Sequence, residues 1–509
     1  MKTIGEIWTE ALNNYAELPA VRWLKKKEIF ERSYKEMGDN VLEIRKALST
    51  LGFHGAHMAL IGTSSVNWVE AYLGITTGDN VAVPLDAGLP AEDLIDLLNR
   101  SDSQVLFLAP ILKPLAAAVK ANCPKVKYIY LLQEEADDEL KTITDLKASA
   151  DPNAELKTSD LDDIATIIYT SGTTGKSKGV MLTQKNFTDN VTSVPYKASP
   201  GGVCLSVLPI HHAFCLVMDW LKGFSIGAVV CINDSLMHMV RNMGIFKPKV
   251  MLMVPLMVET IYKRIAAADP SIPRAAIAEK IFGGNLKIIF TGGAHLDPFY
   301  IEKFEELGVI VLEGYGMSEC SPVISTNMPE DHKAGSIGKP LPNVEVKISE
   351  TGEILARGTS VMKGYYNMPE ETSSTLVDGW LHTGDKGYID EDGFLFINGR
   401  VKNLIILSNG ENISPEEIEN KLALAPLVGE VIVTGENNGL TARIYPDQDV
   451  VAATGLEGDA LKAALQEVLD EYNKNQPTYR QITGLVVRKN PFIKSSTKKI
   501  KRAEALIDE

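Results

Sequence analysis

The sequence contains few cysteines, five in 509 residues, and no Cys-x-x-Cys pair. This scarcity excludes a disulfide framework and predicts reduced thiols in a cytoplasmic protein. An excess of positive charge is also missing: 51 Lys and Arg against 66 Asp and Glu leave a formal net charge of −15. Proteins that wrap nucleic acid or coat anionic membranes are therefore disfavoured. Small molecules or other proteins are the expected partners.

The chain also lacks an apolar run suited to crossing a membrane. The run at 203–232 contains His211, His212, Asp219 and Lys222, and the run at 250–261 is shorter than the roughly 20 residues that a span requires. The N-terminus has acidic and polar residues where a signal peptide has an apolar core. We expect both runs to form buried sheet and helix, and no transmembrane segment. Peripheral contact with a membrane stays open.

Short apolar runs alternate with helix-length amphipathic segments over the first three-quarters of the chain. Strands are expected at 57–63, 81–85 and 104–109, with helices at 41–53, 67–76 and 91–101. This order predicts an α/β fold, with a large layered domain of β-sheets flanked by helices over residues 1–400. Turn-rich hairpins at about 341–400 predict a β-rich subdomain within it. Residues 401–509 predict a small α+β C-terminal domain.

The segment 167–180, IIYTSGTTGKSKGV, follows an expected strand and is rich in Gly, Ser and Thr. Small residues let backbone N–H groups converge on an anion, so this segment is a candidate polyphosphate site. It is not a P-loop, because that motif requires Gly where Thr170 stands. The dinucleotide fingerprint also fails after Gly314 and Gly316, because its third glycine is replaced by Glu319.

The string YTSGTTGKSKG resembles the phosphate-binding signature of the adenylate-forming superfamily, which includes acyl-CoA synthetases, luciferases and nonribosomal-peptide adenylation domains. Further family motifs follow in the same order along nearly the whole chain. They are LPIHHAF at 208–214, TGGA at 291–294, GYGMSE at 314–319, GYYN at 364–367, WLHTGD at 380–385, GR at 399–400 and FIKSSTKKI at 492–500. The segment from Gly399 and the basic ending look closest to bacterial long-chain acyl-CoA synthetases.

The resemblance implies a two-step reaction. The carboxylate of a fatty acid reacts with MgATP to give an acyl-adenylate and pyrophosphate, and the thiol of CoA then displaces AMP. Mixed-anhydride formation supplies AMP as a leaving group, which a bare carboxylate lacks. The site must therefore hold two anions in line and place positive charge where negative charge accumulates.

The resemblance also assigns single residues. Glu319 would bind Mg²⁺ with Thr174 as a hydroxyl partner, and Tyr315 would stack on adenine. Asp385 and Arg400 would bind the ribose. Lys499 would bridge the attacking carboxylate and the α-phosphate, with Lys498 as its rival because the family usually has Gly there. The expected catalytic residues are Lys499, Thr174, Glu319 and His212. The expected ATP- or AMP-binding residues are Thr170, Ser171, Gly172, Thr173, Thr174, Gly175, Lys178, Gly293, Ala294, Gly314, Tyr315, Gly316, Met317, Ser318, Asp385, Arg400 and Lys499.

An acyl pocket and a hinge follow from the same resemblance. The pocket would be an apolar one beside the acyl carboxylate, formed by His212, Phe214, Cys215, Met218, Leu221 and Gly292. We expect His211 and His212 on a strand, pointing to opposite faces, which argues against a shared metal ion. The C-terminal domain would rotate about Lys402 between the two half-reactions, and Gly410 would approach the thiol tunnel.

Two alternatives remain beside an acyl-CoA synthetase. A ligase that loads an acyl carrier protein, or a stand-alone adenylation enzyme, would use the same motifs, because CoA and the carrier protein offer the same phosphopantetheine thiol. A non-catalytic AMP-binding protein is less consistent with the intact Glu319, Asp385, Arg400 and Lys499. Activation of an amino acid is disfavoured, because Cys215 stands where such enzymes usually carry Asp.

Overall fold

The computed structural model describes residues 1–509 except 171–175, 407–411, 437–438, 495–499 and 506–509. Its internal contacts divide the chain into two compact units. The first comprises residues 1–346 and 356–381, and the second comprises residues 347–355 and 382–509. The predicted boundary at 400/401 and the hinge at Lys402 stay predictions.

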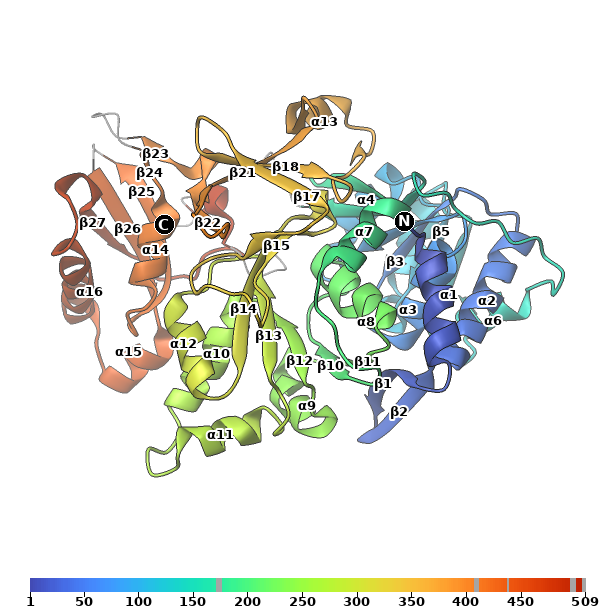
Figure 1. The fold of residues 1–509 in the computed structure, drawn as a ribbon, viewed down its shortest axis with the longest axis horizontal. Coiled ribbons are helices and arrows are strands. Elements are labelled where there is room, and N and C mark those ends of the chain that lie inside the picture. Colours follow the sequence, from blue (N-terminus) through green and yellow to red (C-terminus); the bar gives the residue numbers. More distant parts are fainter. Residues whose placement is uncertain (171–175, 407–411, 437–438, 495–499, 506–509) are drawn as a thin grey trace. The chain divides into compact units, whose positions relative to one another are not determined.

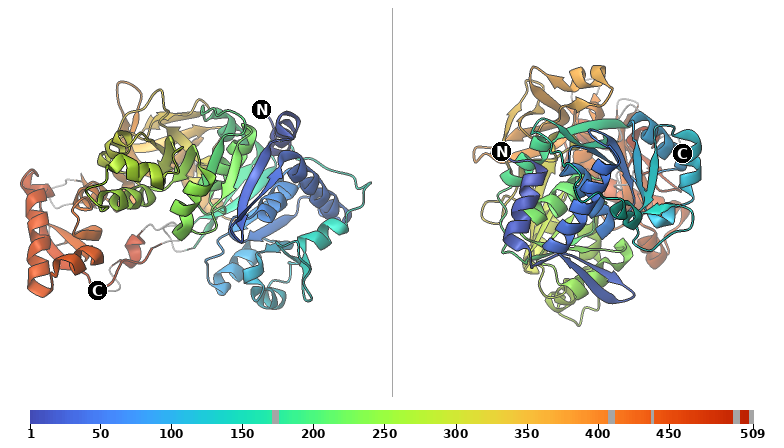
Figure 2. Two further views of the ribbon diagram at one scale, coloured as in Figure 1. Left: turned by 90° about the horizontal axis from the view of Figure 1, so that it is seen from below. Right: turned by 90° about the vertical axis from the view of Figure 1, so that its right-hand side faces the viewer.

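The first unit contains a nine-stranded, mostly parallel sheet. Its spatial order is β16-β15-β14-β13-β12-β10-β11-β1-β2. The strands are β1 (Pro19–Lys25), β2 (Glu28–Ser33), β10 (Val203–Ser206), β11 (Val229–Ile232), β12 (Val250–Met253), β13 (Ile288–Gly292), β14 (Ile310–Gly316), β15 (Val323–Thr326) and β16 (Lys339–Pro340). The hairpin of β1 and β2 forms one edge of the sheet and extends away from it (Figure 1, Figure 2).

A second sheet of eight strands has the order β19-β9-β8-β4-β3-β5-β6-β7. Its strands are β3 (His57–Ile61), β4 (Val81–Leu85), β5 (Val105–Leu108), β6 (Tyr128–Leu131), β7 (Lys141–Thr142), β8 (Ile164–Thr170), β9 (Lys178–Thr183) and β19 (Gly364–Tyr365). The run from β3 to β8 is parallel, whereas β8, β9 and β19 pair antiparallel. The segment predicted to bind phosphate therefore connects two neighbouring antiparallel strands.

Helices cover these sheets, and the sequence explains where several of them begin. Capping boxes start α1 and α2, with Thr3 and Glu6 at the first and Ser33 and Glu36 at the second. The apolar helix α3 is buried almost throughout. The helices of this unit are α1 (Ile4–Tyr15), α2 (Tyr34–Thr50), α3 (Val66–Thr76), α4 (Ala91–Arg100), α5 (Leu115–Asn122), α6 (Ile143–Ala148), α7 (Gln184–Ser193), α8 (Lys222–Ser225), α9 (Met239–Phe246), α10 (Pro255–Ala266), α11 (Arg274–Ile281), α12 (Pro298–Glu306) and α13 (Pro369–Thr375).

The hairpins predicted between 341 and 400 are present. The strands are β17 (Val344–Ile348), β18 (Glu353–Gly358), β20 (Leu376–Val377), β21 (Trp380–Ile389) and β22 (Leu395–Arg400), and the division between the two units runs through their sheet. Within the second unit, β21 and β22 form an antiparallel pair that places Asp385 opposite Arg400.

The rest of the second unit is an α+β arrangement with its own apolar core. A three-stranded sheet packs against helices, and a short two-stranded pair precedes it. The elements are β23 (Ile405–Ile406), β24 (Asn412–Ile413), α14 (Pro415–Leu422), β25 (Val428–Glu436), β26 (Gly439–Pro446), α15 (Gln448–Thr454), α16 (Gly458–Asn473) and β27 (Ile482–Val487). The predicted fold class, a large α/β body with a β-rich part and a small α+β C-terminal part, is confirmed.

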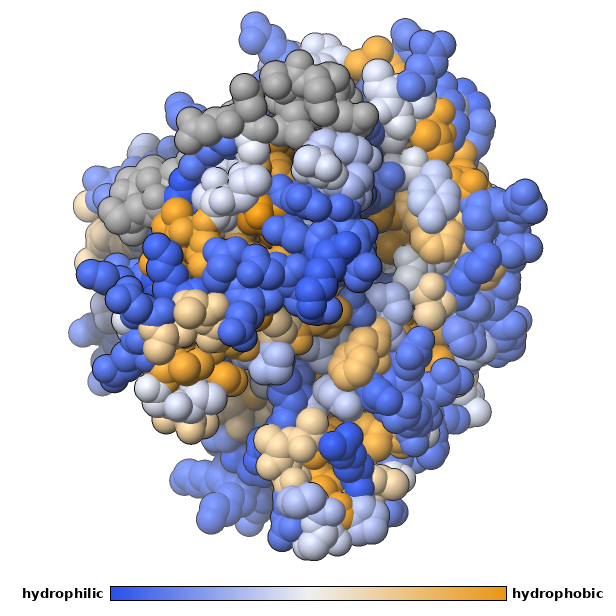
Figure 3. Space-filling model, turned by 90° about the vertical axis from the view of Figure 1, so that its left-hand side faces the viewer, coloured by the Kyte–Doolittle hydropathy of each residue, from blue (hydrophilic) through white to orange (hydrophobic). Residues whose placement is uncertain are grey.

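Among the described residues, no helix is both long and apolar enough to span a membrane. The molecular face drawn in Figure 3 is mostly hydrophilic, with small apolar patches between the polar side chains. All five cysteines, which lie within the described part of the chain, are free thiols.

Candidate active site

The stem of the predicted phosphate loop is fixed by neighbouring side chains. Thr170 ends β8 and pairs with Lys178, which begins β9. From the end of α4, Arg100 donates to the carbonyl oxygen of Ser177 at 2.6 Å and lies 5.7 Å from the ring centroid of Tyr169. Both strands that lead into the loop are thus held by one guanidinium. Sequence reasoning missed Arg100, because it belongs to no family motif.

Several predicted residues cannot be located. Ser171, Gly172, Thr173, Thr174, Gly175, Gly410, Lys498 and Lys499 lie outside the described residues. Their roles in phosphate binding, metal binding, thiol access and catalysis stay predictions.

The two glycine segments predicted to line adenine meet at neighbouring strand ends. Gly292 of β13 pairs with Gly314 of β14. A Cβ on Gly292 would lie 2.8 Å from the carbonyl oxygen of Gly314, so β13 requires glycine at this position. Gly293 and Ala294 follow on the exposed side of this edge, and Tyr315 is buried at it. Adenine stacking on Tyr315 stays a prediction.

Glu319 lies in the short 3₁₀ turn Ser318–Cys320 that follows β14, so Met317 and Ser318 precede it directly. The hydroxyl of Tyr365 donates to Glu319 Oε1 at 2.8 Å. The ammonium of Lys178 lies 4.7 Å from the ring centroid of the same tyrosine. Burial and the charge of Glu319 raise the pKa of Tyr365, so its hydroxyl remains a donor at neutral pH. The structure therefore brings together three distant motifs.

Asn190 of α7 holds the segment after Glu319 in place. Its buried side-chain amide donates to the carbonyl oxygen of Val323 at 2.8 Å and to Ser360 Oγ at 3.1 Å, and it accepts from the backbone N–H of Val323. A buried amide whose hydrogen bonds are satisfied defines one local arrangement. Nothing in the sequence distinguished Asn190 from a surface helix residue.

Asp385 and Arg400, predicted to share the ribose, form an ion pair in the second unit. Arg400 Nε lies 2.9 Å from Asp385 Oδ1, and Asp385 is buried while Arg400 is half exposed. The backbone N–H of Asp385 donates to Thr383 Oγ1 at 3.1 Å. One carboxylate oxygen of Asp385 is thus held by the arginine.

The histidine pair differs from the expectation. His211 and His212 lie in a turn after β10, and their ring centroids are 4.3 Å apart. The prediction that they sit on a strand and face opposite sides is wrong, because Pro209 and the turn end the strand at Ser206. Burial lowers the pKa of His211, which lies 3.6 Å from Asp86. The described residues contain no cluster of three His, Cys, Asp or Glu side chains that could hold a metal ion.

The predicted acyl-pocket residues Cys215, Met218 and Leu221 lie on a π-helix, Cys215–Leu221, that directly follows Phe214. The same helix carries Asp219, which is fully buried and accepts from Ser206 Oγ at 2.9 Å. Burial raises the pKa of this carboxyl to about 7. The apolar wall predicted here therefore adjoins a polar group. In the sequence, Asp219 stands out as an acidic residue inside a long apolar run.

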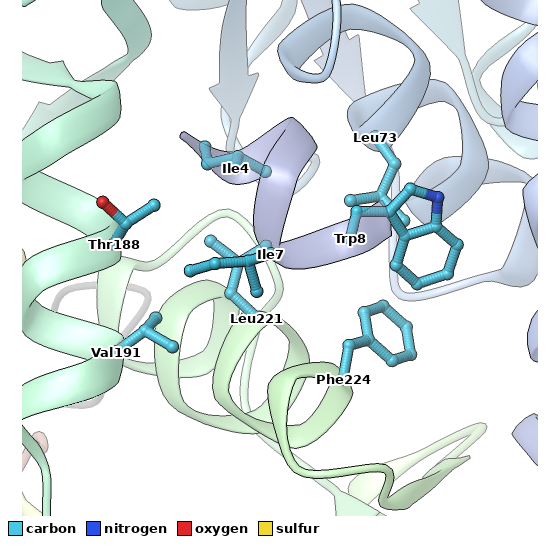
Figure 4. A pocket seen from close by; sticks show the side chains of 8 residues that line it. All are labelled: Ile4, Ile7, Trp8, Leu73, Thr188, Val191, Leu221 and Phe224. Carbon is cyan, nitrogen blue, oxygen red and sulfur yellow. The ribbon is translucent and has the colours of Figure 1, made fainter. Parts of the chain in front are cut away.

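A small apolar cavity adjoins the end of this π-helix (Figure 4). Its lining residues are Ile4, Ile7, Trp8, Leu73, Thr188, Val191, Leu221 and Phe224. The free volume of about 10 Å³ admits roughly one water molecule and no alkyl tail. The cavity is a packing gap, and the acyl pocket itself stays a prediction.

A second buried carboxyl lies beside the adenine motif. Glu313 pairs with Thr291 across β14 and β13, one residue before the paired glycines. Glu313 Oε2 and Thr291 Oγ1 are buried without a protein hydrogen-bond partner, and burial raises the pKa of Glu313 to about 8. Thr291 belongs to the recognised motif at 291–294, which does not itself indicate this contact, whereas Glu313 directly precedes the motif at 314–319 and was missed from sequence.

Comparison with known proteins agrees with these motifs. A family model described as AMP-binding enzyme matches residues 8–366, and one described as AMP-binding enzyme C-terminal domain matches residues 402–508. The chain is 28% identical over 448 residues to long-chain-fatty-acid–CoA ligase FadD15 of Mycobacterium bovis, which covers 79% of this chain and 74% of that protein. It is 32% identical over 399 residues to oxalate–CoA ligase of Arabidopsis thaliana, with 75% and 76% covered.

The fold is also that of solved adenylate-forming enzymes. The crystal structure of the anthranilate CoA ligase AuaEII with anthranoyl-AMP matches with a TM-score of 0.84 at 21% identity, covering 98% of this chain and 96% of that one. The chain therefore belongs to the AMP-binding enzyme family, within the adenylate-forming superfamily, and the predicted class of acid–thiol ligase is confirmed.

Proposed function

We propose that this enzyme activates a fatty acid with ATP, releases pyrophosphate and transfers the acyl group from AMP to the thiol of CoA. The observation that carries the proposal is the contact of Tyr365 with both Lys178 and Glu319, because it brings together a cation and an acid from separate motifs. The fatty acid is supported by the relatives named long-chain-fatty-acid–CoA ligases and by the apolar residues of the π-helix.

Each group would have a defined task in adenylation. Lys178 would attract the nucleotide phosphates, and Asp385 with Arg400 would hold the ribose. A closed site that keeps the two anions in line converts a bimolecular reaction into a nearly unimolecular one. Lys499 would place its ammonium between the attacking carboxylate and the α-phosphate, where negative charge grows in the transition state.

The donor set near Glu319 fits Mg²⁺. Mg²⁺ prefers oxygen ligands and is usually held by one or two carboxylates together with substrate phosphates and water. Glu319 supplies such a carboxylate, partly exposed and already bound by a neutral hydroxyl donor. Bound there, the cation would supply positive charge to the polyphosphate. We also propose a reducing, cytoplasmic location, which the five free thiols support.

A panel of acids tests the proposal. The purified enzyme with MgATP is given straight-chain fatty acids of short, medium and long chain, oxalate and an aromatic acid, each with CoA, with a holo acyl carrier protein and with neither acceptor. AMP release and thioester formation with CoA, greatest for fatty acids, is the expected result. A thioester formed only on the carrier protein would contradict the choice of CoA. Preference for oxalate or the aromatic acid would contradict the choice of fatty acid.

A further inference from the structure

Tyr365 connects two parts of the predicted nucleotide site that are far apart in sequence. The two-residue strand β19 pairs antiparallel with β9, with Gly364 opposite Met181 and Tyr365 opposite Val180. This register places the tyrosine ring beside Lys178, two residues before Val180 on the same strand. The phenol hydroxyl then reaches Glu319 in the turn after β14. All three residues belong to the first unit.

The phenol is held in one orientation. Only 5% of Tyr365 is exposed, and its backbone N–H donates to Thr372 Oγ1 at 2.9 Å. The turn that carries Glu319 is tied to the same segment, because the backbone N–H of Met362 donates to the carbonyl oxygen of Glu319 at 2.9 Å. Backbone and side chain of Glu319 are therefore both bound by residues 362–365. A ring needed only for packing would not require the hydroxyl.

We propose that Tyr365 is a positioning residue that fixes the Glu319 carboxylate for the cation carried by ATP while its ring holds the Lys178 ammonium beside the phosphates. The inference rests on the proposed function and deepens it. A carboxylate that accepts a hydrogen bond from a fixed donor loses rotational freedom and keeps its remaining lone pairs for a cation. The ring face attracts the ammonium without neutralising its charge. Positive charge thus stays available to the polyphosphate.

Tyr365→Phe tests this inference, because it keeps the ring and the Lys178 contact but removes the donor to Glu319. Tyr366→Phe is the matched control. The hydroxyl of Tyr366 donates to Asp102 Oδ2 at 2.7 Å, and Asp102 is paired with Lys125 in a surface network. Both variants therefore lose one hydrogen bond from a tyrosine to a carboxylate, and only one of those carboxylates is Glu319.

Two affinities are measured. Electron paramagnetic resonance reports the binding of Mn²⁺ to the enzyme–ATP complex in the absence of acid and CoA. A separate titration in EDTA reports the binding of metal-free ATP. Loss of a side chain that orients a metal ligand typically weakens metal binding 10- to 100-fold. We expect about tenfold weaker Mn²⁺ binding for Tyr365→Phe, unchanged metal-free ATP binding, and wild-type behaviour for Tyr366→Phe. Equal Mn²⁺ affinity in wild type and Tyr365→Phe would overturn the inference, as would an equal loss in the two variants.

A double variant separates positioning from structural damage. If Tyr365 acts through Glu319, then Tyr365→Phe has no further effect on Mn²⁺ binding once Glu319→Gln is present. A further loss of similar size in that background would show that the tyrosine acts otherwise. The two proposals fail separately: an enzyme that binds Mn²⁺ and ATP as expected but activates no acid in the panel would refute the proposed function and leave the role of Tyr365 intact.

Discussion

Gly316 shows how strictly one residue is constrained at the nucleotide motif. A Cβ built on it would lie 1.9 Å from the carbonyl oxygen of Pro322, which is backbone and has little freedom to move away. The carbonyl of Pro322 also accepts the N–H of Met317, so the close approach belongs to the turn that leads to Glu319. We expect Gly316→Ala to destabilise the first unit by about 3 kcal/mol, because overpacking forces the backbone to shift. Urea unfolding of the purified variant measures this.

Gly244→Ala is the matched control for that substitution. Gly244 lies inside α9, and a Cβ there would meet nothing within 4 Å. Alanine at a helix interior is more stable than glycine by roughly 0.5–1 kcal/mol, so this variant is expected to gain stability. Equal midpoints for wild type and Gly316→Ala would show that the turn is not as tight as the structure indicates.

The sequence predicted those site residues that belong to a recognised motif. Asp385 and Arg400 were expected to act together, and strand register does pair them. Arg100 and Asn190 were not expected, because each acts through the backbone of another segment and so leaves no signature in its own. Tyr365 belongs to the motif at 364–367, which does not itself indicate a task for its hydroxyl. Its hydrogen bond to Glu319 depends on the pairing of β19 with β9, which no local pattern reveals.

At the scale of elements, periodicity predicted regular helices and strands well. The expected strands at 57–63, 81–85 and 104–109 correspond to β3, β4 and β5. The π-helix Cys215–Leu221 was not predicted, because its pattern differs from an α-helix by hydrogen-bond register and not by composition. His211 and His212 were expected on a strand for a different reason. A short apolar run does not distinguish a strand from a turn that leads into a helix.

The π-helix buries a carboxyl that makes stability depend on pH. Burial raises the pKa of Asp219 from the usual 3.8 to about 7, so the folded chain keeps a proton that the unfolded chain releases between these values. Its contribution to the free energy of unfolding is therefore fully present below about pH 4 and lost as the pH rises to about 7. This pKa difference between the unfolded and the folded chain changes the free energy of unfolding by on the order of 4 kcal/mol.

Asp219→Asn tests this dependence, because the amide keeps the acceptor for Ser206 but does not ionise. We expect the variant to be as stable as wild type near pH 4. Above pH 7 it should be more stable than wild type, because burial disfavours the ionised carboxylate of Asp219. Urea unfolding at a series of pH values gives the difference. Glu345→Gln, in an exposed pair with Arg357, is the control and should change stability by less than about 1 kcal/mol. Parallel pH curves for wild type and Asp219→Asn would contradict the assignment.

For the whole molecule, a net charge of −15 means that local groups must attract ATP. Two basic residues of the C-terminal tail are already paired with acidic side chains. Lys494 pairs with Glu430 at 2.7 Å and Arg502 with Glu419 at 2.6 Å, both within the second unit. Lys494 also forms a β-bridge with Ile500. The charges of Lys494 and Arg502 are therefore already used within the second unit.

The role predicted for Lys499 implies that mutation can separate the two half-reactions. Lys499→Ala should lower carboxylate-dependent exchange of pyrophosphate into ATP by 100-fold or more, because a preorganised cation at the reacting phosphate is typically worth that much. It should spare thioester formation from supplied acyl-adenylate and CoA, because Lys499 is predicted to act on the attack of the carboxylate at the α-phosphate, a step that is already complete in the acyl-adenylate. Lys498→Ala, one residue away and equally charged, is expected to keep both activities. Normal exchange by Lys499→Ala together with loss of exchange by Lys498→Ala would move the catalytic role to the neighbouring lysine.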